Sequence, residues 1–286
     1  MEKIGIHRVT VDDGVEVAAH VYGQGPAIVF VHGALEDGEK LWLEMTSHLS
    51  DRYRCYLMDM RGTGISDDHP DLSPERQVRD LVAFAESVDG PVGVVGESGG
   101  AIWTLGAAAR SAAIAAAALY EPVAFEIQTR EQAEAFQEGA ARMKELVEEG
   151  RLTEAAKVFL RGVYSDEEWA TVPREYLVAS GHYVPRQLNE FEQLAASQYS
   201  PTASEELVKI DIPLLLMAGT RGEISEWVEA GVRYIAQHAE DTRISTLEGL
   251  GHAAPSLQPE IVADELRQFF DQTLPRGEAP RPESRM

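Results

Sequence analysis

One serine of this sequence stands in a setting suited to a nucleophile. Ser98 lies in the segment 96–100 (GESGG), between a short apolar run at residues 92–96 and a helical pattern that begins at Ala101. A serine on a tight strand-to-helix turn exposes its hydroxyl oxygen, and small neighbours prevent clashes there. The pattern Gly-x-Ser-x-Gly also occurs in ordinary loops, where the serine is only a turn residue. The flanking strand and helix make Ser98 a candidate nucleophile.

Three further segments occur in a meaningful order along the chain. Residues 32–34 (HGA) end an early apolar run, residues 59–66 (DMRGTGIS) end the next, and residues 248–252 (EGLGH) lie near the C-terminus. A histidine can take a proton from a serine hydroxyl, and a loop after a strand can offer backbone N–H groups to an oxyanion. Asp59 and Arg61 are expected to hold their turn by hydrogen bonds rather than to react.

With these four motifs in this order, the chain resembles the α/β-hydrolase family. The resemblance runs from about residue 25 to residue 270, with a helical cap inserted at residues 122–200. It implies that Ser98 is the nucleophile and that His252 is the general base. It also implies an oxyanion hole formed by the backbone N–H groups of Ala34 and Gly99. The four motifs are specific for the fold and leave the substrate open.

Two neighbours of these motifs are candidates for contact with a substrate. His32 precedes the oxyanion loop and is expected to brace that loop rather than to transfer protons. Glu97 adjoins Ser98, and it either contacts a ligand or is a solvated residue of the turn. We favour the solvated position for Glu97.

The acid of the expected triad departs from the commonest family pattern. That pattern has an Asp three residues after the glycine that ends the strand at 214–218, and here Gly222 holds the position. Glu223 follows one residue later, whereas Glu121 ends the neighbouring strand, where some relatives such as the haloalkane dehalogenases place their acid. We favour Glu121 over Glu223 as the carboxylate that orients His252. The alternative for Glu121 is a carboxylate that binds backbone N–H groups where the cap joins the core.

Alternating strands and helices are predicted to position these residues. Valines at alternate positions around Asp13-Gly14 predict a β-hairpin. Apolar runs predict strands at residues 27–31, 53–60, 92–96, 116–120, 214–218 and 243–247. Ser73-Pro74 predicts the start of a helix, and residues 257–270 predict the last one. Continuous apolar strands separated by helices indicate an α/β fold with a doubly wound, mostly parallel sheet covered on both faces.

Residues 122–200 break that alternation with helical patterns. Two apolar stripes run along them, formed by Ala133, Phe136, Ala140, Met143 and Val147 and by Leu188, Phe191, Leu194 and Ala195. Residues 165–168 (SDEE) fit a capping box. We interpret this segment as a cap that closes over the strand ends and shapes an apolar pocket. The core then comprises residues 1–121 and 201–274, and residues 275–286 are predicted to be disordered.

Composition excludes several function classes. The chain has 286 residues, 44% of them hydrophobic, and its net charge of -23 argues against nucleic acids and anionic membranes as partners. A single cysteine, Cys55, excludes an intramolecular disulfide, and the histidines lack metal-ligand spacing, so no metal is predicted. No phosphate loop or dinucleotide fingerprint indicates a cofactor. Without a signal-like start or a bilayer-length apolar run, a cytoplasmic protein is expected.

The expected activity is that of a cofactor-independent serine hydrolase, which cleaves a small-molecule ester, lactone or thioester through an acyl-enzyme. The resemblance also includes amidases, C–C bond hydrolases and cofactor-free haloperoxidases. Dehalogenases and epoxide hydrolases are disfavoured, because they have an Asp where this chain has Ser98. Alternatives of another class are a weakly catalytic or non-catalytic ligand receptor and an interaction protein with a decayed site, the latter suggested only by Gly222. The oligomeric state, a homodimer included, stays open.

Overall fold

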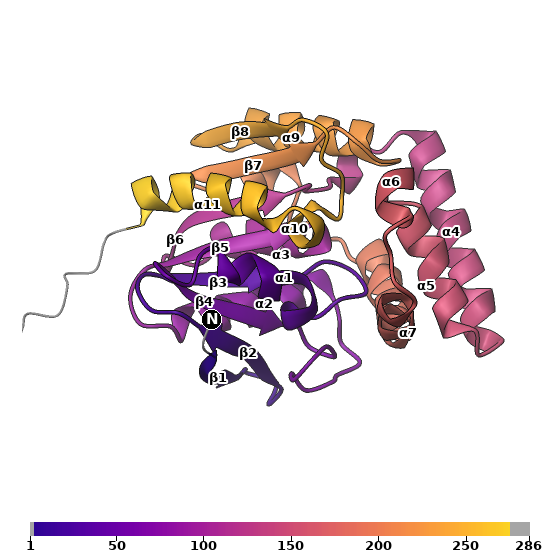
Figure 1. Ribbon diagram of the computed structural model, residues 1–286, viewed down its shortest axis with the longest axis horizontal. Helices are drawn as coiled ribbons and strands as arrows, with labels where there is room; N and C mark the ends of the chain where they lie inside the picture. Colours follow the sequence, from indigo (N-terminus) through magenta and orange to yellow (C-terminus); the bar gives the residue numbers. More distant parts are fainter. Residues whose placement is uncertain (1–2, 275–286) are drawn as a thin grey trace, which may run out of the picture.

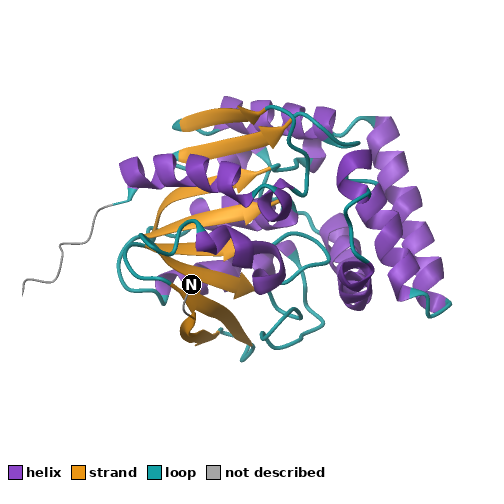
Figure 2. Cartoon of the chain, viewed as in Figure 1, coloured by secondary structure: helices purple, strands orange, loops and turns teal. Residues whose placement is uncertain are grey.

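Residues 3–274 of the chain, which the computed structural model describes, contain a sheet with helices packed on both faces (Figures 1 and 2). The strands are β1 (Lys3–Thr10), β2 (Glu16–Tyr22), β3 (Ala27–Val31), β4 (Arg54–Asp59), β5 (Val92–Glu97), β6 (Ile114–Tyr120), β7 (Leu214–Gly219) and β8 (Thr242–Leu247). Their order across the sheet is β1-β2-β4-β3-β5-β6-β7-β8. The β1/β2 and β2/β4 pairs are antiparallel, and all other neighbours are parallel. The predicted doubly wound fold is confirmed.

The first two strands form the expected hairpin. Val9 pairs with Val17 across it, and the Val11 N–H donates a hydrogen bond to the Val15 carbonyl oxygen at 2.9 Å. Gly14 has φ +88°, a left-handed conformation that glycine adopts without strain. The Asp13-Gly14 signal in the sequence therefore marks the turn itself.

Helices cover the two faces of the sheet from different parts of the chain. The core helices are α1 (Gly38–Ser47), α2 (Pro74–Glu86), α3 (Gly99–Ala108), α8 (Ser204–Leu207), α9 (Ser225–His238), α10 (Ala254–Leu257) and α11 (Pro259–Thr273). Helices α2, α3 and α9 pack on the face that receives Val29 of β3. Helices α1 and α11 pack on the opposite face, which receives Ile28 and Phe30. Successive residues of β3 are thus buried on both faces, which explains its continuous apolar sequence.

Two helix starts differ in detail from the sequence prediction. Ser73 precedes α2 as expected, but its hydroxyl donates to Asp71 Oδ1 at 2.7 Å instead of capping the helix. The predicted last helix at residues 257–270 is divided into α10 and α11. Gln258 between them has φ -132° and ψ 54° because Pro259 disfavours helical backbone in the residue before it. Pro259 then begins α11. The tail predicted at residues 275–286 lies outside the described residues.

Four helices between β6 and β7 stand beyond the carboxyl ends of the parallel strands (Figure 1). They are α4 (Arg130–Glu148), α5 (Leu152–Arg161), α6 (Asp166–Trp169) and α7 (Arg174–Ala196), called the cap below; a short 3-10 turn, η1 (Phe125–Ile127), leads into them. The predicted capping box of Ser165 and Glu168 is present at α6. Leu35 and Ala253 of the core join the cap's own apolar cluster. The cap therefore packs directly on loops that carry the motifs.

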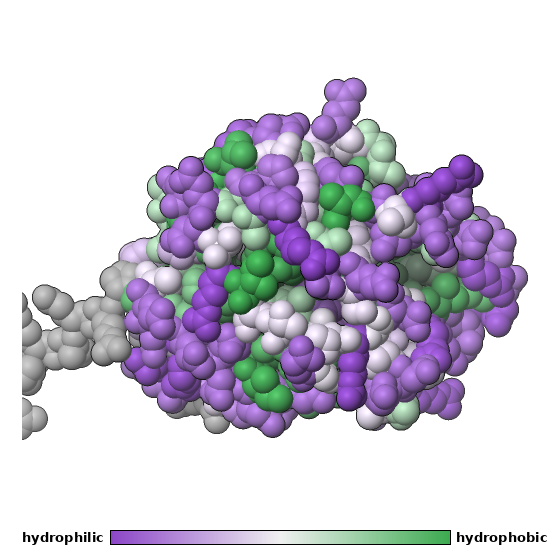
Figure 3. Space-filling model, turned by 90° about the horizontal axis from the view of Figure 1, so that it is seen from above, coloured by the Kyte–Doolittle hydropathy of each residue, from purple (hydrophilic) through white to green (hydrophobic). Residues whose placement is uncertain are grey.

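The surface shows no broad apolar area on the face drawn in Figure 3, where hydrophobic residues form small, separate groups among hydrophilic ones. Within residues 3–274, no helix combines the length and the hydropathy needed to cross a membrane.

Candidate active site

Ser98 lies on the sharp turn between β5 and α3. Its φ of 52° and ψ of -117° are unusual for a residue with a side chain. Small neighbours permit the turn: a Cβ on Gly96 would lie 2.6 Å from the Gly100 carbonyl oxygen, and one on Gly100 would lie 2.5 Å from the His32 carbonyl oxygen. The Ser98 N–H donates to the Tyr120 carbonyl oxygen at 3.0 Å. The backbone is thus the strained strand-to-helix turn predicted from the motif.

His252 lies in the loop after β8, and the carboxylate of the residue that follows β6 contacts its Nδ1 atom. Glu121 Oε2 is 2.6 Å from Nδ1, and Glu121 Oε1 accepts a hydrogen bond from the Gly219 N–H at 3.0 Å. Glu121 is only 1% exposed and has φ 46°, so its backbone departs from the strand just before the cap. A carboxylate held in this way accepts the Nδ1 proton and fixes the imidazole ring.

The alternative acid, Glu223, does not contact His252. Glu223 is exposed, and among the described residues no hydrogen bond or ion pair joins it to His252. Gly222, in the position of the usual Asp, has φ +109°. Of the two carboxylates considered from the sequence, the structure places Glu121 beside His252.

A second carboxylate contacts the other ring nitrogen of His252. Glu97 Oε1 is 3.0 Å from Nε2, and Glu97 is only 5% exposed. A Cβ on Gly33 would overlap Glu97 Oε2, so the glycine leaves room for this carboxylate. The expectation that Glu97 is solvated is therefore wrong. Glu97 ends a central strand, where the loop after β3 and His252 cover it.

These two carboxylates control the protonation of His252. Burial alone would lower the pKa of His252, but Glu97 and Glu121 raise it well above its usual value. This raised pKa favours the imidazolium form, in which both ring nitrogens donate. An imidazolium cannot accept a proton, so His252 must lose one, and Glu97 must release Nε2, before this ring can act as a base toward Ser98.

The two residues expected at the oxyanion hole lie around the same space as Ser98. Ala34 lies in the loop between β3 and α1, and Gly99 is the first residue of α3. Both line a large cavity together with Ser98. The N–H groups of a helix's first turn lack partners within the helix and favour negative charge, which suits Gly99 for this role.

His32 is placed behind this loop rather than in the cavity. Its Nδ1 is 2.8 Å from the Gly33 carbonyl oxygen, and its Nε2 is 3.0 Å from Thr63 Oγ1 and 3.2 Å from the Met60 amide nitrogen. Burial lowers the pKa of His32 to about 4, so the ring is neutral at physiological pH. His32 therefore connects the loops after β3 and β4. A contact with substrate, the other role considered, has no support in this placement.

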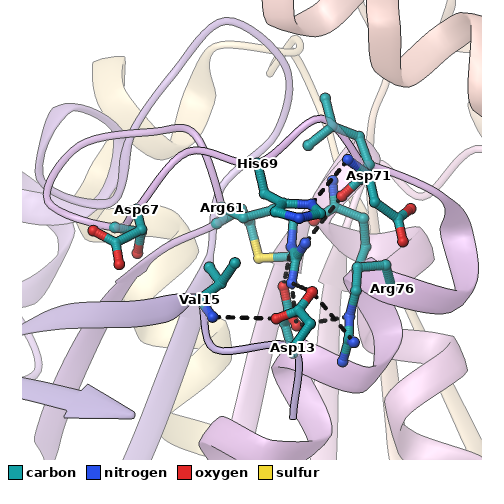
Figure 4. A network of polar contacts seen from close by, with 12 residues as sticks. Asp13, Val15, Arg61, Asp67, His69, Asp71 and Arg76 are labelled. Atoms are coloured by element: carbon teal, nitrogen blue, oxygen red, sulfur yellow. Dashed lines mark hydrogen bonds and ion pairs between the residues drawn. The ribbon is translucent and has the colours of Figure 1, made fainter. Parts of the chain in front are cut away.

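The loop after β4 is held by its own charged residues, as expected. Asp59 accepts hydrogen bonds from the N–H groups of Gly38 at 2.6 Å and Ile65 at 2.8 Å. Arg61 is completely buried and pairs with Asp80 at 2.5 Å and Asp13 at 3.0 Å. Figure 4 shows Asp13 between the guanidinium groups of Arg61 and Arg76. This network ties the loop to the hairpin and to α2.

The large cavity lies between the nucleophile turn and the cap and has a volume of about 790 Å³. Apolar side chains of α3, η1 and the cap form much of its wall, including Trp103, Phe125, Phe136, Phe159 and Phe191. Both apolar stripes noted in the sequence contribute to it through Phe136 and Phe191. Its charged groups are four carboxylates, those of Glu131, Glu190, Glu223 and Glu226, and one guanidinium, that of Arg161.

Sequence reasoning missed a buried acid near the nucleophile. Glu36 accepts a hydrogen bond from the Tyr176 hydroxyl, which lies 2.8 Å from the Tyr164 hydroxyl. Glu36 and Tyr164 line a small cavity with Ser98 and His252. The only signal in the sequence is an acidic residue close to the 32–34 motif, and nothing in a sequence indicates that a cap tyrosine covers it. In the described part of the chain, no group of three or more His, Cys, Asp or Glu side chains could hold a metal ion.

Comparison with known proteins gives a consistent result. A 65-residue stretch is 42% identical to a cis-3-alkyl-4-alkyloxetan-2-one decarboxylase of Xanthomonas campestris pv. campestris, and covers 23% of this chain and 21% of that protein. A 2-hydroxy-6-oxo-6-(2'-aminophenyl)hexa-2,4-dienoic acid hydrolase of Metapseudomonas resinovorans is 25% identical over 283 residues, which are 94% of this chain and 92% of that protein.

Solved structures show the same architecture. An α/β hydrolase from Sphaerobacter thermophilus superposes with a TM-score of 0.73 at 26% identity, covering 92% of this chain and 100% of that one. The family model described as "Alpha/beta hydrolase family" matches residues 28–265. With this match across most of the chain, and with the ordered motifs on their expected strand ends, the protein belongs to the alpha/beta hydrolase family.

Proposed function

We propose that this protein is a cofactor-independent serine hydrolase that cleaves a small-molecule ester, lactone or thioester through an acyl-enzyme. The contact of 2.6 Å between Glu121 Oε2 and His252 Nδ1 carries the proposal, because it prepares the ring to act as a base. Ser98 supports it from the turn that faces a cavity large enough for a small organic molecule.

The first half of the reaction uses the large cavity. Ser98 Oγ attacks the carbonyl carbon of the substrate while its proton passes to His252 Nε2. The N–H groups of Ala34 and Gly99 stabilise the negative charge on the carbonyl oxygen. Glu121 stabilises the imidazolium, which then gives its proton to the departing alcohol or thiol. The acyl group stays on Ser98.

Glu97 makes this acylation reaction depend on pH. In the resting arrangement its carboxylate accepts the Nε2 proton of the imidazolium at 3.0 Å. Once the ring is neutral, the Nε2 lone pair faces carboxylate lone pairs, so the contact becomes repulsive and opens. Nε2 is then free for the Ser98 hydroxyl.

The charges around the large cavity favour neutral or cationic substrates over anionic ones. Of the four carboxylates in its lining, Glu190 is paired with Arg186 at 3.0 Å, and the single guanidinium, that of Arg161, is paired with Asp166 at 2.5 Å. An anionic substrate would also approach Glu97 and Glu121 near Ser98, whose two negative charges a protonated His252 offsets only in part, without a free cation from the cavity wall. We therefore expect neutral esters to react faster than esters that carry a carboxylate on the acyl group.

A C–C bond hydrolase is the second candidate, and the match to the Metapseudomonas resinovorans hydrolase over 94% of this chain favours it. The substrate in that protein's name is an acid, whereas the cavity charges here disfavour anions. Parallel assays with neutral esters and with a carboxylate-bearing dienone separate the two candidates.

Covalent labelling of the nucleophile tests the proposal most directly. A fluorophosphonate probe should add once to the wild-type chain, as read by intact mass, and peptide mapping should place it on Ser98. Ser98→Ala should lose both labelling and hydrolysis of p-nitrophenyl butyrate, with an unchanged circular dichroism spectrum. Ser204→Ala, in helix α8 and outside the lining of both the large cavity and the space around His252, is the matched control and should retain both. Labelling at another serine, or hydrolysis by Ser98→Ala, would contradict the proposal. A wild-type chain that is folded and binds the ester but does not hydrolyse it would favour a receptor.

A further inference from the structure

A small cavity adjoins Ser98 on the side where His252 lies. It has a volume of about 20 Å³. Its polar lining comes from Glu36, Glu97, Ser98, Tyr164, His252 and Ser256. Ala34, Ser98, Phe159 and Val163 line both this cavity and the large one, so the nucleophile stands where the two spaces adjoin. A space of this size with several polar neighbours suits one water molecule and excludes larger groups.

Glu36 presents an unsatisfied oxygen in this lining. The side chain is 5% exposed, and its Oε1 accepts the hydrogen bond of the Tyr176 hydroxyl. Its Oε2 is buried and has no hydrogen-bond partner among the described residues. A buried carboxylate oxygen without a partner is costly, and a water molecule that donates a hydrogen bond would remove this cost.

The surroundings of Glu36 fix its orientation. The Tyr176 hydroxyl lies 2.8 Å from the Tyr164 hydroxyl, and Lys40 Nζ lies 4.0 Å from the centre of the Tyr176 ring. Burial raises the pKa of Glu36 to about 7; Lys40 from α1 and the Tyr176 hydroxyl from α7 oppose the rise, and Glu97 from β5 and the adjacent Asp37 add to it. Near pH 7 about half of Glu36 is therefore ionised, and above that pH the ionised form, which accepts a hydrogen bond at Oε2, predominates.

We propose that this small cavity binds the water molecule that hydrolyses the acyl-enzyme, and that Glu36 positions this water through Oε2. The inference rests on the proposed function, since it concerns the second half of the same reaction. It assigns separate spaces to the two reactants: the acyl group occupies the large cavity, and the water occupies the small one beside His252.

The hydrolytic step then proceeds between the two spaces. The water oxygen attacks the acyl carbon on Ser98, and one water proton passes to His252 Nε2. The tetrahedral intermediate collapses, the bond from the acyl carbon to Ser98 Oγ breaks, and His252 returns the proton to Oγ. The carboxylic acid leaves with the water oxygen. Glu36 accepts a hydrogen bond from the other water proton and is unchanged at the end.

The variant Glu36→Gln tests this role because the Tyr176 hydroxyl decides which amide atom faces the cavity. The hydroxyl donates, so it should hold the Gln oxygen and turn the NH₂ group toward the water, replacing an acceptor by a donor. Deacylation should then fall by about 10- to 100-fold, as expected for a lost hydrogen bond to a charged group. Acylation, measured by single-turnover release of p-nitrophenolate from p-nitrophenyl butyrate, should change by less than about twofold.

Accumulation of the acyl-enzyme is the diagnostic readout. Glu36→Gln should show a burst of p-nitrophenolate, and intact mass should show a butyryl adduct that persists longer than in the wild type. Glu206→Gln, at a buried glutamate that pairs with Arg110 and Lys209 and lines neither cavity, should match the wild type in both steps. Leu41→Phe, which narrows the cavity without removing the carboxylate, should also slow deacylation and carries the test if Glu36→Gln does not fold.

The outcomes separate this inference from the proposed function. If the wild type forms no adduct on Ser98, the proposed function fails. If the adduct forms but Glu36→Gln, or Leu41→Phe in its place, deacylates at the wild-type rate, only the water site fails. Equal slowing of acylation and deacylation would likewise overturn the water site, because it would indicate a general disturbance of the triad.

Discussion

The two sides of Ser98 are built on different principles. On one side, His252, Glu97 and Glu121 are all buried and joined by contacts of 3.0 Å and 2.6 Å. On the other side, a cavity of about 790 Å³ is bounded largely by apolar side chains of α3 and the cap. Charged groups at such distances fix atoms and protonation states, whereas an apolar wall mainly sets size and shape. We infer that the strand ends of the core determine the chemistry and that the cap determines which substrate fits.

The charged side is itself divided by the two nitrogens of His252. The carboxylate on Nδ1, Glu121, is also held by the Gly219 N–H and can stay in place throughout the reaction. The carboxylate on Nε2, Glu97, occupies the atom that must exchange protons with Ser98. Removing the first should therefore destroy the base, while removing the second should release it.

The largest effect is expected from Glu121→Gln. The Gly219 N–H would hold the Gln oxygen, so the NH₂ group would face Nδ1 and favour the wrong tautomer of His252. We expect kcat for p-nitrophenyl butyrate to fall by about a thousandfold or more, with little change in KM. Glu223→Gln is the matched control at the exposed alternative and should change kcat by less than about threefold. The reverse ranking would place the acid after β7.

A change in pH dependence is expected from Glu97→Gln. Because Glu97 and Glu121 raise the pKa of His252, the wild type should gain its neutral base, and hence its activity, only above pH 6.5. Without the Glu97 charge the pKa of His252 falls, so the acidic limb of the kcat/KM profile should move toward lower pH. Activity at pH 6 relative to the plateau should rise about severalfold or more. A limb that stays in place, or moves to higher pH, would show that Glu97 does not control Nε2.

The sequence alone predicted the strands, the nucleophile turn and the acid on which these predictions rest. Apolar runs between turn signals located the strands, and the glycines around Ser98 indicated the tight turn because only small residues fit there. Glu121 could be chosen because neighbouring parallel strands end at the same edge of the sheet, which brings it near the loop of His252. In each case a local pattern, together with the geometry of a parallel sheet, was sufficient.

The rest depends on contacts between distant segments. Glu97 resembles a turn residue in the sequence, and only the loop after β3 and His252 bury it. Glu36 is covered by Tyr176, which comes from the cap. No periodicity links such residues, because their meeting is decided by how the cap packs on the core. Protonation could not be predicted for the same reason, since the pKa of His252 reflects two carboxylates from different strands.

A moderate effect on stability is expected from Glu36→Gln. The pKa of Glu36 is raised from 4.5 to about 7 in the folded chain, chiefly by burial. The folded state therefore binds this proton more tightly than the unfolded state, and the associated stability is lost as the pH rises through about 7. From pH 5 to pH 8 the unfolding free energy of the wild type should fall by about 1 to 3 kcal/mol more than that of the variant, which lacks this titrating group. Urea unfolding at the two pH values measures this difference, and equal losses would contradict it.

The smallest effect is expected on the apolar side, from Phe191→Ala in α7. The Phe191 ring packs against Phe136, with ring centres 4.9 Å apart, and both rings line the large cavity. Removing one ring should enlarge the space for the acyl chain while leaving the triad untouched. We expect the preference between p-nitrophenyl octanoate and p-nitrophenyl acetate, compared as kcat/KM, to shift toward octanoate by about 3- to 10-fold, with acetate turnover within about twofold. Val178→Ala, an exposed change on the same helix, should leave the preference as it is. If Phe191→Ala instead slowed both esters alike, the cap would contribute to the chemistry, and the two sides of Ser98 would not be separable.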